Sequence, residues 1–348
     1  MDPVDPVDAV NPAGAADTGT GLPAPGRASG GPAGSGRPVM VVLRGLGLGD
    51  LLTAVPALRA LRRAFPGHRV TLAAPAPLAG LLPLIGACDD LLDVSGPGPV
   101  PLRRPDVAVN LHGRGPQSAA ALLATRPARL IGHARPGLPG PPWPAQVHER
   151  VRWCDLLTWH GIPADPADLT LTPPSAGSGA PARESHSGPA PVLVHPGAAR
   201  SARRWPPDRF AMVAAALRRA GHDVLVTGGA AERGLALRVA AVAGLPDEAV
   251  TAGRTDVTGL AALVARARLV VCGDTGVAHL ASAFGTPSVV LFGPTPPELW
   301  GPPPGPHVAL WAGVPGDPHA GRPGPGLLRI GVEEVLGAAT DLLEVTVR

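Results

Sequence analysis

Four short stretches combine glycine with charged or hydroxyl side chains, and each follows an apolar run of strand length. The first reads Arg44-Gly-Leu-Gly-Leu-Gly-Asp50. At the start of a helix, this turn would leave backbone amides free to bind the oxygen atoms of a ligand. Asp50 is a candidate general base, because one positioned carboxylate can take the proton of an attacking hydroxyl. Capping the helix is the alternative role for Asp50.

This glycine turn does not carry the fingerprint of a nicotinamide dinucleotide site. The fingerprint G-x-G-x-x-G places Asp50 at the third glycine when it is counted from Gly45, and Leu52 there when it is counted from Gly47. The sequence therefore disfavours a dehydrogenase.

The second stretch, Leu269–Gly285, predicts a strand, a tight turn and a helix of small residues. Amides near Thr275 and Gly276 would point at a diphosphate, which the small side chains let approach. His279 lies on the same helical face as Thr275 and is expected to bind the donor, with a structural role as the alternative. Asp274 is expected to cap the helix or bind a sugar hydroxyl, since its charge would repel phosphate.

The third and fourth stretches follow strands in the same half of the chain. In His195–Pro206, Arg203 and Arg204 could neutralise a leaving diphosphate, and a solvated loop is the alternative. In Thr227-Gly-Gly-Ala-Ala-Glu232, the carboxylate could accept hydrogen bonds from a ribose or a sugar, or only begin a helix.

The elements that must position these stretches alternate between β-branched runs and helical periodicity. This alternation predicts parallel sheets, in which ligands bind beyond the carboxyl ends of the strands. A helix is expected near 147–160. Strands are expected at 39–43, 70–74, 91–94, 106–112 and 128–132, and again at 192–195, 223–227, 250–252, 269–272 and 289–292.

A chain of 348 residues suits two domains. We expect a disordered tail over 1–37, which is rich in proline, glycine and alanine. An N-terminal domain over 38–172, a linker over 173–190 and a C-terminal domain over 191–330 follow. The last segment, 331–348, predicts a helix whose apolar face packs back on a domain surface.

Composition narrows the class of protein. All 30 basic residues are arginine, and the net charge of +3 is too small to indicate a nucleic-acid partner. The three cysteines are far apart, and no Asp-x-Asp triplet is present, so neither a disulfide framework nor a metal site is indicated. No apolar run is long enough for a signal sequence or a membrane span. We therefore expect a cytoplasmic protein with at most peripheral contact at the membrane face.

The motifs together resemble glycosyltransferase family 9, which includes the ADP-heptose:lipopolysaccharide heptosyltransferases. The resemblance runs from residue 38 through nearly the whole chain. It rests on the Arg44–Asp50 turn with Pro56-Ala-Leu58, His195-Pro-Gly197 with Arg204-Trp-Pro206, Gly273–His279, and Phe292-Gly-Pro-Thr295. The resemblance implies an α/β fold of the GT-B type, with two facing Rossmann-like domains and the donor in the C-terminal one. It also implies inversion at the anomeric carbon and no cofactor or metal.

The resemblance also assigns roles to residues. Asp50 matches the catalytic aspartate of the family, and Glu232 matches the acid that contacts the nucleoside. At Arg203 the family usually has lysine, so charge neutralisation is expected with a different geometry. The donor-binding set is His195, Gly197, Arg204, Glu232, Asp274, Thr275, Gly276 and His279, and the acceptor-side loop carries Arg44, Gly47 and Gly49.

The expected function is transfer of a sugar, most commonly heptose from ADP-heptose, to a hydroxyl of a lipopolysaccharide-core or other cell-envelope glycan. The expected partners are a nucleotide sugar and a glycan or glycolipid acceptor. Two alternatives remain open: a nucleotide-sugar 2-epimerase on the same fold, and a non-catalytic scaffold that binds nucleotide sugars.

Overall fold

The computed structural model describes residues 36–174 and 190–345. The predicted tail up to residue 35, most of the predicted linker and the last three residues lie outside the described residues. The described residues from Arg37 onward form one compact unit. Within it the chain builds two parallel sheets, one in each half, while the domain boundaries stay predictions.

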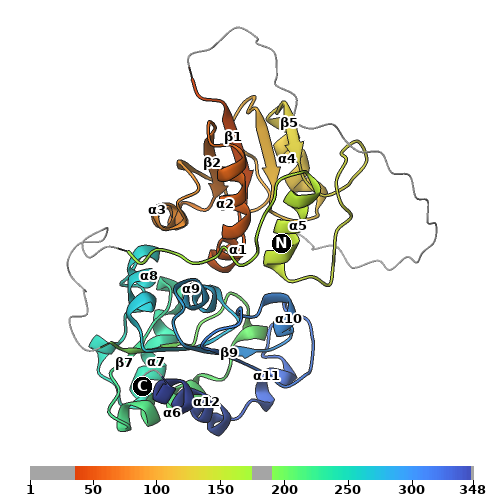
Figure 1. Ribbon diagram of the computed structural model, residues 1–348. Helices are drawn as coiled ribbons and strands as arrows, with labels where there is room; N and C mark the ends of the chain where they lie inside the picture. Colours follow the sequence, from red (N-terminus) through yellow and green to blue (C-terminus); the bar gives the residue numbers. More distant parts are fainter. Residues whose placement is uncertain (1–35, 175–189, 346–348) are drawn as a thin grey trace. The chain divides into compact units, whose positions relative to one another are not determined.

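The first sheet holds five parallel strands in the order β3-β2-β1-β4-β5 (Figure 1). This is the Rossmann order, which reverses direction between β1 and β4. The strands are β1 (Val39–Leu43), β2 (Arg69–Ala74), β3 (Asp90–Asp93), β4 (Val107–Asn110) and β5 (Arg129–Ile131).

Helices cover both faces of this sheet. Side chains alternate along β1, so that Met40 and Val42 pack in one apolar cluster with α2 and α5, whereas Val41 and Leu43 pack in another with Leu122 of α4. The helices are α1 (Leu48–Thr53), α2 (Val55–Ala64), α3 (Leu82–Ile85), α4 (Pro116–Ala124) and α5 (Glu149–Trp159), and η1 (Ala76–Leu81) is a 3₁₀ turn.

The second sheet also has five parallel strands, in the order β10-β9-β8-β6-β7. Its direction reverses between β6 and β8. The strands are β6 (Val192–His195), β7 (Val224–Val226), β8 (Leu269–Gly273), β9 (Ser288–Phe292) and β10 (His307–Trp311).

The helices of the second half lie between these strands and after them. They are α6 (Pro207–Arg219), α7 (Arg233–Ala243), α8 (Val257–Arg266), α9 (Gly276–Phe284), α10 (Pro297–Trp300), α11 (Pro325–Arg329) and α12 (Val332–Val345), with 3₁₀ turns η2 (Ser201–Arg203), η3 (Ala230–Glu232) and η4 (Asp247–Ala249). Helix α12 buries Val335, Ala339 and Leu343 and contacts α6, β8 and β9, which belong to this same half.

One predicted strand is absent and one observed strand was not predicted. Around 250–252 the chain makes only an isolated bridge between Val250 and Val226, because η4 precedes it and Gly253 turns away at φ +71°. The fifth strand is β10 instead. It lies at an edge, is only partly buried, and follows a run of proline and glycine that resembles a loop.

Candidate active site

The predicted functional stretches lie at the two points where the strand order reverses. Arg44 directly follows β1, and His112 lies two residues after β4. In the second sheet, His195 ends β6 and Asp274 follows β8. Such switch points are where parallel sheets bind ligands, so the strand order alone brings these residues to binding positions.

Asp50 is the third residue of α1, and its carboxylate does not cap the helix. The N-cap is Gly47, which has no side chain to form a capping bond, so the N-cap alternative for Asp50 is wrong. The carboxylate is 32% exposed and its Oδ1 lies 3.5 Å from Nη2 of Arg44. A negative charge in the first turn is favoured by the helix dipole. The structure thus leaves a partly exposed carboxylate with a single, long ion pair.

Arg44 is fully buried and holds the glycine turn from inside. Its Nε donates to the backbone oxygen of Asp50 at 2.9 Å, and its Nη1 donates to that of Leu111 at 2.5 Å. Burial lowers the pKa of Arg44 to about 10, and the nearby Asp50 charge opposes this shift. Arg44 therefore stays a cation at neutral pH. Its guanidinium, on the predicted acceptor side, binds groups of the protein itself.

Two glycines let the start of α1 contact the start of α9. A Cβ on Gly49 would lie 2.8 Å from Cδ2 of His279, and a Cβ on Gly276 would lie 2.8 Å from Cβ of Leu48. Real Cβ atoms essentially never show contacts that short, so a side chain at either position would force its neighbour to shift. The predicted base, Asp50, therefore follows directly after a residue that contacts the predicted donor turn.

Asp274 forms an ion pair in the donor turn. Its side chain is almost fully buried, and its Oδ2 lies 3.6 Å from Nη1 of Arg203. Burial raises the pKa of Asp274, and the charge of Arg203 opposes the rise. The N-cap of α9 is Thr275, whose side chain makes no capping bond. Asp274 thus orients Arg203, and the Thr275 hydroxyl is free of a capping role.

His279 is a neutral imidazole at this position. It is half-buried and lies edge-on to Trp300, with ring centroids 5.9 Å apart. Burial, with the neighbouring His148 and arginines, lowers the pKa of His279 to about 3. His279 can therefore exchange hydrogen bonds with a ligand but cannot supply a positive charge to a diphosphate at neutral pH.

His195, Gly197 and Glu232 meet beyond β6. The His195 Nδ1 lies 2.9 Å from the Thr227 hydroxyl, and its Nε2 lies 4.0 Å from Oε2 of Glu232. Burial lowers the pKa of His195. Glu232 Oε2 accepts from the Gly229 amide at 2.8 Å, so this carboxylate does begin a helical turn. A Cβ on Gly197 would lie 2.2 Å from Glu232 Oε1, so glycine there makes room for the carboxylate.

Three more residues lie near these switch points. One, Arg204, was predicted to bind the donor, and the other two, His112 and Glu149, were not predicted as site residues. Arg204 donates from Nε to the Ala198 carbonyl at 2.9 Å and so braces its own loop. His112 has a buried Nδ1 that has no hydrogen-bond partner within the described residues. Glu149 contacts Arg44 from the first position of α5. Two sequence features could have pointed to these residues. Glu149 lies near the start of the helix predicted at 147–160, and His112 lies at the end of the strand predicted at 106–112.

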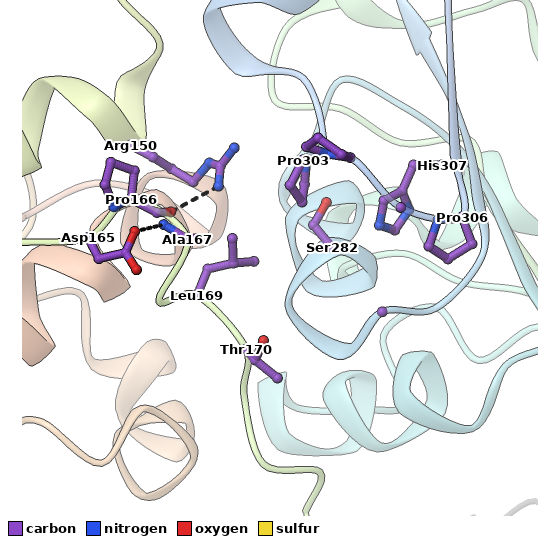
Figure 2. Close-up of a pocket in the computed structure, with 13 residues that line it drawn as sticks. Arg150, Asp165, Pro166, Ala167, Leu169, Thr170, Ser282, Pro303, Pro306 and His307 are labelled. Carbon is purple, nitrogen blue, oxygen red and sulfur yellow. Dashed lines mark hydrogen bonds between the residues drawn. The ribbon is translucent and has the colours of Figure 1, made fainter.

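The site residues described above do not line the cavity of about 540 Å³ that Figure 2 shows. It is lined by Arg150 of α5, by the segment 165–170, and by Ser282, Gly285 and 303–307. Arg150 donates to the Pro166 carbonyl at 3.0 Å, and Asp165 accepts from the Ala167 amide at 2.9 Å (Figure 2). None of the predicted site residues lines this cavity, so it adds nothing to the candidate active site.

Residues 36–174 and 190–345 contain neither a cluster of metal ligands nor a helix that could span a membrane. No three histidine, cysteine, aspartate or glutamate side chains there come together as metal ligands. Within the same ranges, no helix combines the length and the apolar character needed to cross a membrane.

The chain is similar to known proteins in part of its sequence and in its fold. Residues 152–319 match the model of glycosyltransferase family 9 (heptosyltransferase). Lipopolysaccharide heptosyltransferase 3 of Escherichia coli is 32% identical over 124 residues, which cover 35% of this chain and 36% of that protein. The matched region thus spans about a third of the length of this curated relative.

Solved structures show the same fold over more of the chain. The glycosyl transferase family 9 structure from Veillonella parvula has a TM-score of 0.71 at 21% identity and covers 88% of this chain and 98% of its own. The E. coli heptosyltransferase WaaC with ADP has a TM-score of 0.65 at 17% identity, covering 87% and 99%. The architecture is therefore of the GT-B type, as expected. Over residues 152–319 the chain is similar to glycosyltransferase family 9, the family that its motifs resemble.

Proposed function

We propose that this chain is an inverting, metal-independent glycosyltransferase that moves heptose from ADP-heptose to a hydroxyl of a lipopolysaccharide-core or other cell-envelope glycan. The observation that carries the proposal is the position of Asp50. Its carboxylate makes no capping bond, and Asp50 directly follows Gly49, which contacts His279 of the donor turn. The heptosyltransferase names of the matching relatives and the ADP named with one similar structure support the choice of donor.

In the proposed reaction, Asp50 accepts the proton of the acceptor hydroxyl while that oxygen attacks the anomeric carbon. The bond between this carbon and the diphosphate oxygen breaks, and the nucleotide diphosphate leaves with the electron pair. One displacement inverts the configuration and needs one carboxylate as base. The amides at the start of α9 and the guanidinium of Arg203 stabilise the charge that builds on the diphosphate.

The positive charge of Arg203 is partly compensated before any ligand binds. It is 27% exposed on its side chain and is already paired with Asp274 at 3.6 Å. Its planar fork can still bind two phosphate oxygens, which a lysine ammonium cannot do in the same geometry. Since His279 is neutral, Arg203 of η2, which pairs with Asp274 of the donor turn, is the cation that would meet the diphosphate. Glu232, beside Gly197, would accept hydrogen bonds from the ribose.

Two other functions would use the same donor site. A nucleotide-sugar 2-epimerase changes the stereochemistry of the nucleotide sugar and needs no acceptor hydroxyl. A non-catalytic scaffold would bind the nucleotide sugar and release nothing. Asp50 next to the donor turn favours transfer, because neither alternative accounts for a base at the acceptor side of the fold.

The first experiment is calorimetric titration of the protein with ADP, UDP, GDP and dTDP. We expect selective binding of ADP, which weakens in Glu232→Ala and Thr275→Val and is retained in Asp208→Asn, a change at an exposed ion pair on α6. Product analysis with ADP-heptose and a candidate glycan then separates transfer from epimerisation, since only transfer releases ADP. Binding of none of the four nucleotides would refute the proposed function, and binding without any turnover would favour the scaffold.

A further inference from the structure

Two carboxylates share one nitrogen of a buried arginine. Nη2 of Arg44 lies 2.9 Å from Oε1 of Glu149 and 3.5 Å from Oδ1 of Asp50. Arg44 is fully buried, the Glu149 side chain is 7% exposed, and the Asp50 side chain is 32% exposed. The shorter ion pair, between Arg44 and Glu149, is therefore also the more buried one. The pair between Arg44 and Asp50, the proposed base, is longer and more exposed to solvent.

Glu149 is fixed in place by several donors. Besides Arg44, its Oε1 accepts from Nε1 of Trp153 at 2.9 Å, and its Oε2 pairs with Nη1 of Arg152. Trp153 also lies under the Arg44 guanidinium, 4.9 Å from it. Burying a carboxylate is costly unless it is paired and hydrogen-bonded, and here both oxygens are satisfied by cations and an indole. This arrangement fixes Nη2 of Arg44, the same nitrogen that faces Asp50.

We propose that Glu149 is a positioning residue for the transfer reaction, which holds Arg44 by the shorter ion pair and so keeps Arg44 from neutralising Asp50. The inference rests on the proposed function, in which Asp50 is the base. A cation near a carboxylate favours its ionised form and weakens it as a base, whereas a second carboxylate has the opposite effect. Glu149 takes up the charge of Arg44 and leaves Asp50 able to accept a proton.

Other charged or titratable groups also lie near Asp50, and all of them except Arg152 are unchanged in the test variants. From the turn after β4 comes His112, whose pKa burial lowers, and from the donor turn comes Asp274. Behind them lie Arg203, paired with Asp274, and His279, against Gly49. Arg152 acts through Glu149. Because these groups surround Asp50 from several elements, the test changes one charge at a time.

The test reads Asp50 directly, without an acceptor. The protein is labelled with ¹³Cγ-aspartate, the Asp50 resonance is identified by its loss in Asp50→Asn, and its chemical shift is followed against pH. In Glu149→Gln the positive charge near Asp50 rises by one, so the titration midpoint should fall by about one pH unit relative to wild type. In Arg152→Gln the positive charge falls by one, so the midpoint should move to higher pH.

The Asp50 midpoint should move in opposite directions in Glu149→Gln and Arg152→Gln, which a merely structural role of Glu149 would not produce. Asp168→Asn removes a carboxylate that pairs with Arg59 and Arg63 elsewhere in the same half, so it should lower stability without moving the Asp50 midpoint. Midpoints that stay still in both variants, or that move in the same direction, would overturn the inference. If Glu149→Gln does not fold, the upward shift in Arg152→Gln decides alone. ADP titration of the same samples tests the proposed function separately, since ADP binding does not require the Asp50 shift.

Discussion

His148 is hydrogen-bonded to Gly301, and the bond joins the start of α5 to the end of α10. Nδ1 of His148 accepts from the Arg150 amide at 3.1 Å, so the proton lies on Nε2, which is 3.0 Å from the Gly301 carbonyl. One side chain thus caps the helix that carries Glu149 and also contacts the segment next to Trp300. Burial lowers the pKa of His148, which keeps this neutral form at physiological pH.

Replacing this histidine should destabilise the protein. In His148→Ala the cap of α5 and the bond to Gly301 are both lost, and we expect the free energy of unfolding to fall by about 1–2 kcal/mol. Urea unfolding at neutral pH measures this change. His319→Ala, at an exposed histidine, is the matched control and should leave the midpoint unchanged. Equal effects of the two substitutions would contradict the capping role.

Asp50→Asn should abolish transfer while sparing the donor site. The amide keeps the size of the carboxylate but cannot accept a proton, and removal of a general base typically lowers kcat by 10²–10⁴-fold. We expect ADP binding to stay within a few-fold of wild type in calorimetry. Unchanged turnover of ADP-heptose by this variant would exclude Asp50 as the base.

Adding a methyl group between α1 and α9 should weaken ADP binding and lower stability more than the same change elsewhere. Gly49→Ala puts a Cβ within 2.8 Å of the His279 ring, and overpacking of this kind costs about 1–3 kcal/mol. The ring must shift, so ADP binding should weaken. Gly234→Ala in α7 meets nothing within 4 Å and should be neutral or slightly stabilising. Calorimetry and urea unfolding on both variants make the comparison, and retained ADP affinity in Gly49→Ala would count against the contact.

The neutral state of His279 predicts a loss of stability in acid. Its pKa in the folded protein is about 3, below the ordinary histidine value of 6.5. Between these values the unfolded chain binds more protons than the folded one, so stability rises with pH across this window and falls as pH drops below about 6.5. In His279→Gln the part of the slope due to this group disappears. Urea midpoints measured from pH 7 to pH 4.5 should therefore change less than in wild type, and an identical slope would contradict the prediction.

Much of the fold could be predicted because strand patterns and turn chemistry are local. The β-branched runs before Arg44, His195 and Asp274 became buried strands, and the turns after them lie at the switch points. The segment around Val250 misled the prediction, because a short apolar run cannot show how many neighbours it pairs with. The edge strand β10 was missed for the opposite reason, since its flanking prolines resemble a loop.

The candidate site was predictable as a set of turns but not as a network of charges. Asp50 could be placed at the start of a helix, yet the sequence could not show that Gly47 is the cap. Glu149 lies 105 residues from Arg44, and their ion pair depends on how α5 packs against the sheet. Long-range pairing of this kind leaves no spacing pattern in one sequence.

Helix α12 is part of the apolar core of the second half. The last helix buries Val335, Ala339 and Leu343 against α6, β8 and β9, which belong to the half that would hold the donor. A protein cut before Val332 would therefore expose apolar side chains of α6, β8 and β9 to water.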